Sequence, residues 1–234
     1  MYLFPAFRIV SLEGGMAMVG WVRWREKWRL WPKAAPVGVL GFPLLGVDLP
    51  RGNPESRGRQ AAKLLRRRGA ARALLPPELA GAFPGVSPLP LCRALGAELA
   101  LALLEEIPLR ERRVTLRGER ADRLALTLAD ALCPRVGALY LDFDRGGEAL
   151  ATYLHSRYGA PPRPGQAPDG GLWVELAPGG EERPALRLWG EPDLLGLELS
   201  IGETLPPDLP TLPFLTLLWE SGRVKKEDIM IGKP

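Results

Sequence analysis

The chain has 234 residues and a formal net charge of +4, and 46% of its residues are hydrophobic. This composition supplies a buried core and excludes general disorder, and two cysteines are too few for a small disulfide-stabilised domain. No uncharged run reaches the roughly 18–20 residues needed to cross a bilayer, and no basic segment precedes the first apolar residues. We therefore expect a cytoplasmic protein without a signal peptide or a membrane partner.

The charge is unevenly distributed along the chain. Residues 1–72 contain 14 Lys and Arg but 4 Asp and Glu, whereas residues 73–234 contain 17 and 23. A basic first third predicts either an anionic partner, such as nucleic acid, or an attraction between the two parts of the chain.

Residues 1–50 predict an antiparallel β region. Strand patterns cover residues 8–12 and 16–24, and between Trp21 and Trp31 basic and apolar residues alternate with a period of two. We expect two antiparallel strands that turn near residues 25–27, then a strand at 37–40 and a proline-rich exit near Pro50. The basic face would carry Arg23, Arg25 and Arg29. Beside tryptophans these cations suit single-stranded nucleic acid, although an ordinary sheet with one buried and one solvated face gives the same pattern.

Residues 51–177 alternate between helix and strand patterns. Helices are expected at 54–68, 88–106, 120–132 and 147–158, and strands at 71–75, 113–116, 138–143 and 172–176. Short connections between such elements predict a parallel sheet with right-handed crossovers, and we expect a Rossmann-like three-layer α/β unit. Residues 178–234 predict a β-rich extension with strands at 185–189, 195–201 and 228–231 and a helix at 211–221. This extension would pack on the same domain and add antiparallel strands to those of the first fifty residues.

The turn after the strand at 113–116 stands where a Rossmann unit binds a dinucleotide. Only Gly118 of the glycine pattern is present, and Arg120 and Arg123 occupy the places of the later glycines. Arg117 or Arg120 would then hold a phosphate directly, unless the turn binds nothing. Asp142, 24 residues after Gly118, would bind a ribose hydroxyl.

Residues 142–151 read D-F-D-R-G-G-E-A-L-A and resemble the D-x-D-R-E-G-E-A-I-A segment of the Toprim domain of type IA topoisomerases and bacterial primases. The resemblance implies Mg²⁺ held by Asp142 and Asp144, with Glu148 as the acid of the segment. It also implies a third acid after an earlier strand, for which Glu78 is the candidate and Glu119 the other. Gly146 departs from the family pattern. Alternatively, Asp144 caps the following helix and Gly146 and Gly147 free the turn.

Neither His155, the single histidine, nor Cys92 or Cys133 has a partner at catalytic or metal-ligand spacing. We therefore expect a non-catalytic ligand-binding or interaction protein with a degenerate dinucleotide-type site, whose ligand is a nucleotide or another anionic small molecule. That site would comprise Gly118, Arg120, Asp142, Gly146 and Gly147. A Toprim-like Mg²⁺-dependent nucleic-acid enzyme and a nucleic-acid-binding protein that uses the basic first third remain alternatives.

Overall fold

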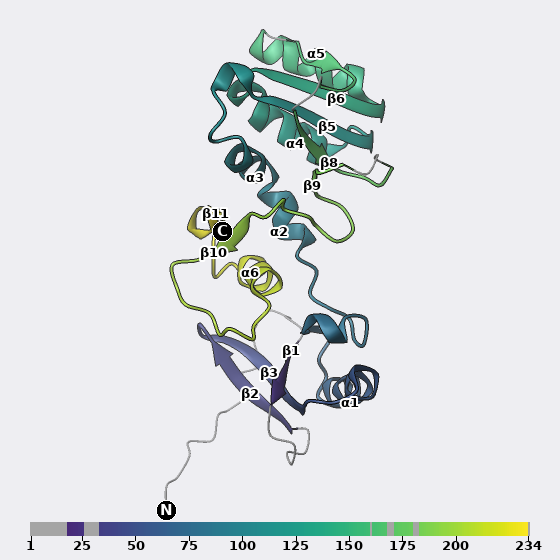
Figure 1. The fold of residues 1–234 in the computed structure, drawn as a ribbon, viewed down its shortest axis with the longest axis vertical. Helices are drawn as coiled ribbons and strands as arrows, with labels where there is room; N and C mark the ends of the chain where they lie inside the picture. Colours follow the sequence, from purple (N-terminus) through teal and green to yellow (C-terminus); the bar gives the residue numbers. More distant parts are fainter. Residues whose placement is uncertain (1–17, 26–32, 160, 168–170, 180–182, 234) are drawn as a thin grey trace, which may run out of the picture. The chain divides into compact units, whose positions relative to one another are not determined.

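The computed structural model describes residues 18–25, 33–159, 161–167, 171–179 and 183–233 (Figure 1). The chain forms two compact units, which we call unit 1 (Met1–Gly85 with Pro206–Pro210) and unit 2 (Val86–Leu205 with Thr211–Pro234). The strand expected at residues 8–12 and the second half of the tryptophan–arginine hairpin lie outside the described residues.

Unit 1 is built on a four-stranded sheet in the order β2-β3-β1-β4. Its strands are β1 (Val19–Arg25), β2 (Lys33–Val39), β3 (Phe42–Pro50) and β4 (Arg72–Leu74). Strand β1 runs parallel to both β3 and β4, and β2 and β3 form an antiparallel hairpin. Helix α1 (Pro54–Arg67) connects β3 to β4, and its Ala61, Ala62 and Leu65 belong to one buried cluster with Val47 and Leu49 of β3.

Two expectations for this region are wrong. Residues 42–50, expected to lead out of the β region, form a strand between β2 and β1. The sheet tolerates Pro43 because the pairing of this strand with β1 begins only at Leu45, opposite Gly20, so the missing amide of the proline is not needed for that pairing. Helix α1 and strand β4, expected in the later parallel sheet, belong to the first sheet because β4 pairs with β1.

Unit 2 contains a five-stranded parallel sheet in the order β7-β6-β5-β8-β9, which confirms the Rossmann-like α/β fold class. Its strands are β5 (Arg113–Arg120), β6 (Ala138–Arg145), β7 (Arg163–Pro164), β8 (Leu172–Glu175) and β9 (Leu186–Arg187). The helices are α2 (Leu89–Ala94), α3 (Gly96–Leu103), α4 (Arg123–Leu132), α5 (Gly147–Tyr158) and α6 (Thr211–Glu220). Strands β10 (Glu198–Ser200) and β11 (Met230–Gly232) form the antiparallel addition at the C-terminal end.

The single helix expected at residues 88–106 is divided into α2 and α3 at Leu95, whose φ and ψ are −98° and 8°. Gly96 begins α3 close to its neighbours, since a Cβ atom there would lie 2.7 Å from a Leu188 methyl and 2.8 Å from a Leu128 methyl. The division between α2 and α3 therefore lies where Gly96 packs closely against Leu128 and Leu188. Residues 163 and 164, which lie between the helix expected at 147–158 and the strand expected at 172–176, form the short edge strand β7.

The two faces of the five-stranded sheet are covered differently. Val114 of β5 and Leu139 of β6 share one face, where Phe143 lies beside the first residue of α5. Thr115 faces the opposite side, where its hydroxyl accepts a hydrogen bond from the Ala167 amide of the β7–β8 connection at 3.0 Å. The sheet thus lies between a layer of helices and a layer of chain connections.

Candidate ligand site at the carboxyl edge of the parallel sheet

The order of the strands defines where a ligand site would lie in unit 2. From β5 the chain proceeds through β6 to β7 on one side, and it then returns to place β8 and β9 on the other side of β5. The connections therefore diverge between β5 and β8, and open parallel sheets bind ligands outside the carboxyl ends of their strands at such a point. We call the carboxyl ends of β5, β6 and β8 the carboxyl edge. Asp142 and Asp144 lie at this edge on β6, as the parallel arrangement predicts.

Four charged residues form a row across the sheet at this edge. Register places Asp142, Arg117, Glu175 and Arg187 side by side on β6, β5, β8 and β9, so their signs alternate. Arg117 Nε lies 3.6 Å from Asp142 Oδ2, and Arg187 Nε lies 3.9 Å from Glu175 Oε2. The Glu175 side chain is only 6% exposed, and its burial is compensated by Arg187 and by the Trp189 indole, which donates to Glu175 at 3.5 Å. We call this set the charged row.

On the same face of the sheet as the charged row, two residues nearer the amino ends of the strands, lie Thr115, Tyr140 and Trp173. The guanidinium carbon of Arg183 lies 4.0 Å from the centroid of a Trp173 ring, and that of Arg117 lies 5.9 Å away. Arg117 also donates to the Gly179 carbonyl at 3.0 Å, while no described residue accepts a hydrogen bond from its buried Nη1 atom. Cation–π contacts thus hold the connection that follows β8 against the sheet, and a guanidinium donor remains available there.

The rim beyond the charged row has two arginines on adjacent strands. Arg120 ends β5 opposite Arg145, which ends β6, and both are exposed. Helix α5 follows at once from Gly146, which has φ of 80° and provides no side-chain cap. Asp144 therefore does not cap α5, contrary to one of the interpretations of the sequence. Helix α4 differs, because Asp122 caps it by accepting the Ala125 amide at 3.0 Å.

Gly118 lies inside β5 and not in the turn that follows it. Its missing side chain leaves room for Phe143, since a Cβ atom would approach the Phe143 ring to 3.2 Å. The turn before α4 is formed by Ala121 and Asp122, so no glycine stands where a dinucleotide turn would approach a pyrophosphate.

The acids suggested by the Toprim resemblance have other contacts. Asp142 pairs with Arg117 and accepts a hydrogen bond from the side-chain Nε2 of Gln166 at 3.3 Å. Glu78 lies in unit 1, in the 3-10 helix η1 (Pro77–Leu79), and its Oε2 accepts from Trp24 Nε1 at 3.4 Å. Glu148 is exposed in the first turn of α5. In the described part of the chain, no group of three or more His, Cys, Asp and Glu side chains is placed to hold a metal ion.

The residues expected to bind nucleic acid are only partly described. Arg23 Nε lies 2.8 Å and Arg25 Nε 3.1 Å from the same Asp48 oxygen, and the Arg23 side chain is 13% exposed. The guanidinium of Arg23 stacks 4.6 Å from the centroid of Trp21, which is 2% exposed and therefore buried, not part of a solvated basic face. Arg29 lies outside the described residues.

Several other titratable groups lie away from the carboxyl edge. His155 is exposed on α5. Burial raises the pKa of the Cys92 thiol to about 11, and burial also raises the pKa of Cys133, with Asp130 contributing. Thiols of this kind are poor nucleophiles at neutral pH.

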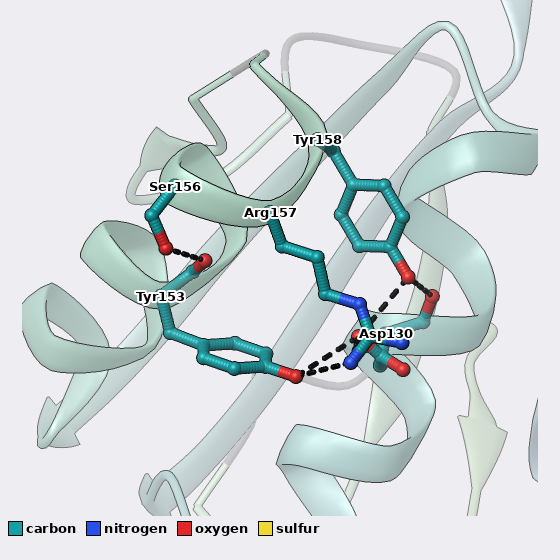
Figure 2. A network of polar contacts seen from close by, with 5 residues as sticks. All are labelled: Asp130, Tyr153, Ser156, Arg157 and Tyr158. Atoms are coloured by element: carbon teal, nitrogen blue, oxygen red, sulfur yellow. Dashed lines mark hydrogen bonds and ion pairs between the residues drawn. The ribbon is translucent and has the colours of Figure 1, made fainter.

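A polar network between α4 and α5 was not expected from the sequence (Figure 2). Asp130 on α4 accepts from the hydroxyl of Tyr158 at 3.1 Å and forms an ion pair with Arg157 at 3.2 Å. The Tyr153 hydroxyl accepts a hydrogen bond from Arg157 and donates one to Asp130 at 3.5 Å, so it contacts both partners of the ion pair. The only signal in the sequence was the spacing of Tyr153 and Arg157, four residues apart on one helix. We call these four residues the Asp130 network.

No family model and no curated protein matches this chain. None of the helices in the described residues is both long and apolar enough to span a membrane.

Proposed function

We propose that this protein binds a nucleotide at the carboxyl edge of the five-stranded sheet in unit 2. The observation that carries the proposal is the reversal of strand order between β5 and β8, which defines the ligand position of open parallel sheets. The charged row lies beneath that position and gives it a rigid polar floor.

Three features favour a phosphate group at the rim. Arg120 and Arg145 end neighbouring strands, and neither forms an ion pair with another described residue. Gly146, the N-cap residue of α5, has no side chain to accept from the first amides of the helix, and amides without such a cap attract anions. Both helices have an acid near their start, Glu148 in the first turn of α5 and Asp122 before α4, but Asp122 already accepts the Ala125 amide, so a second phosphate would have to displace its carboxylate. We therefore infer a mononucleotide as the ligand in preference to a dinucleotide.

The sugar of this ligand would lie against the acid at the end of β6. In Rossmann units an acid at the end of the second strand binds ribose hydroxyls. Asp144 suits this role better than Asp142, because Asp144 is exposed whereas Asp142 is already paired with Arg117. Glu119 occupies the position on β5 that corresponds to Asp144 and would be a second acceptor.

A thermal-shift panel tests this proposal with AMP, GMP, CMP, UMP, NAD, ribose and inorganic phosphate. A ligand at 100 times its Kd stabilises the folded state by about 2.7 kcal/mol, which is on the order of 5–10 °C for a chain of this size. At least one mononucleotide is expected to raise the midpoint, with NAD no more effective than AMP. Asp144→Asn is expected to reduce the nucleotide shift. A panel in which no nucleotide raises the midpoint would contradict the proposal.

A further inference from the structure

A groove in unit 1 runs beside α1 and has a volume of about 500 Å³. One wall is a stripe along α1 formed by Glu55, Arg59, Ala62 and Arg66. The other wall comes from η1 and the residues after it, namely Glu78, Leu79, Ala80 and Ala82. The stripe extends over twelve residues of α1, from Glu55 to Arg66, or about 18 Å of helix. We call this feature the α1 groove; its floor is apolar and its α1 rim is cationic.

The cationic rim belongs to the most basic part of the chain. Residues 51–72 contain eight Lys and Arg and one acid, Glu55. Glu55 pairs with Arg59 at 3.2 Å, but both side chains are more than 70% exposed, so this pair neutralises little. Lys63 and Arg67 lie next to the groove stripe on the helix surface, and like Arg66 both are exposed and form no ion pair with another described residue.

We propose that the α1 groove binds single-stranded nucleic acid. Phosphates would lie along Lys63, Arg66 and Arg67, where cations are concentrated and form no ion pair with another described residue. The guanidinium carbon of Arg66 lies 5.9 Å from the centroid of the Phe83 ring, and this contact leaves its charge uncompensated. An unstacked base would enter the groove against Ala62 and Leu79, because only a single strand can turn a base away from its backbone into an apolar hollow. Glu78 on the far wall would accept hydrogen bonds from base amino groups and repel phosphate, so the backbone stays on the α1 side. This proposal concerns unit 1 and is independent of the nucleotide site proposed in unit 2.

The test is fluorescence anisotropy of the full chain with a labelled single-stranded oligonucleotide of mixed sequence, and with its duplex, between 50 and 200 mM salt. The triple substitution Lys63→Ala, Arg66→Ala and Arg67→Ala is expected to weaken single-strand binding at least tenfold. It should also reduce the slope of log K against log salt by about 2, since each phosphate contact on a single strand contributes about 0.7. The matched control is Arg110→Ala, Arg113→Ala and Arg135→Ala, three exposed arginines of unit 2, and it is expected to bind like the wild type.

A second variant separates the groove from simple charge attraction. Ala80 is exposed on the groove wall, so Ala80→Trp is expected to fill the groove and weaken single-strand binding without changing the salt slope. The proposal would be overturned if the wild type did not bind the single strand, or if the two triple variants bound it equally well. It would also be overturned if the duplex bound as tightly as the single strand and Ala80→Trp changed neither affinity.

Discussion

Leu40 adopts a backbone conformation that leucine disfavours. It has φ of 48° and is followed by Gly41 with φ of 70°, and together they form the two-residue connection between β2 and β3. A type I′ turn needs positive φ at both positions, and asparagine and glycine adopt it at lower cost than a residue with a bulky side chain. We therefore expect Leu40→Asn to raise the free energy of unfolding by about 1 kcal/mol relative to Leu40→Ala, as measured by urea denaturation. Equal stability of the two variants would show that the turn is not strained by leucine.

Gly137 is required by a close approach of two backbone segments. A Cβ atom there would lie 2.3 Å from the Arg110 carbonyl oxygen and 2.6 Å from its carbon, which are backbone atoms of the 3-10 helix Leu109–Glu111. Because that backbone must move, we expect Gly137→Ala to cost about 1–3 kcal/mol in unfolding experiments. The control is Gly38→Ala in β2, where a Cβ would meet nothing within 4 Å. A control that destabilises as much as Gly137→Ala would refute this explanation.

At the scale of elements, the Asp130 network joins the end of α4 to the end of α5 (Figure 2). Tyr158 donates to Asp130, and burial raises the pKa of its phenol above the ordinary 10.0, with the hydrogen bond to Asp130 as the second cause. A raised pKa means that the folded state binds the proton more tightly. The contribution of Tyr158 to stability is therefore fully present below about pH 10 and is lost as pH rises through the folded-state pKa.

We expect Tyr158→Phe to lower the thermal midpoint by about 2–4 °C near neutral pH, since it removes hydrogen bonds that link two helices. The difference from the wild type should shrink above pH 10. Tyr153→Phe is the matched control on the same helix. Its hydroxyl is exposed, lies 3.5 Å from Asp130 and accepts from Arg157, which keeps its own ion pair with Asp130, so a smaller effect is expected. A midpoint difference for Tyr158→Phe that does not change with pH would contradict the assigned ionisation.

The elements that the sequence predicted best are those with local end signals. Helix α5 runs over Gly147–Tyr158 as expected, because Gly146 and Gly159 adopt left-handed conformations at its two ends. Strand β3 was missed because Pro43 and Gly46 resemble strand breakers, although the strand is nearly all buried. The division between α2 and α3 was missed because it coincides with contacts of Gly96 to Leu128 and Leu188, which are distant in the sequence.

The sequence predicted the position of the candidate site on the sheet but not the residues that surround it. The edge that carries Asp142 and Asp144 followed from parallel strands. The charged row did not, because Arg117, Glu175 and Arg187 become neighbours only through the strand order, in which β8 returns to the side of β5. The assignment of Glu78 to a shared metal site rested on the expectation that β4 belonged to the later sheet, whereas β4 pairs with β1 in unit 1.

At the scale of the whole molecule, the uneven charge follows the two units. The basic residues 51–72 lie in unit 1, where α1 presents them to solvent, and the acidic remainder of the chain contains the Rossmann-like sheet. Each unit has its own sheet, its own buried helix face and its own candidate ligand surface. The two proposals, a polymeric anionic ligand and a mononucleotide, therefore concern different units.

The central claim is that a nucleotide phosphate binds where β5 and β6 end. Titration calorimetry tests it most directly, with the mononucleotide that gives the largest thermal shift and with the variants Arg120→Ala/Arg145→Ala and Arg110→Ala/Arg135→Ala. We predict that the first pair weakens binding at least tenfold, because it removes both rim cations, and that the second pair, equal in charge but distant from the carboxyl edge, binds like the wild type. Wild-type affinity in the Arg120→Ala/Arg145→Ala protein would contradict the account.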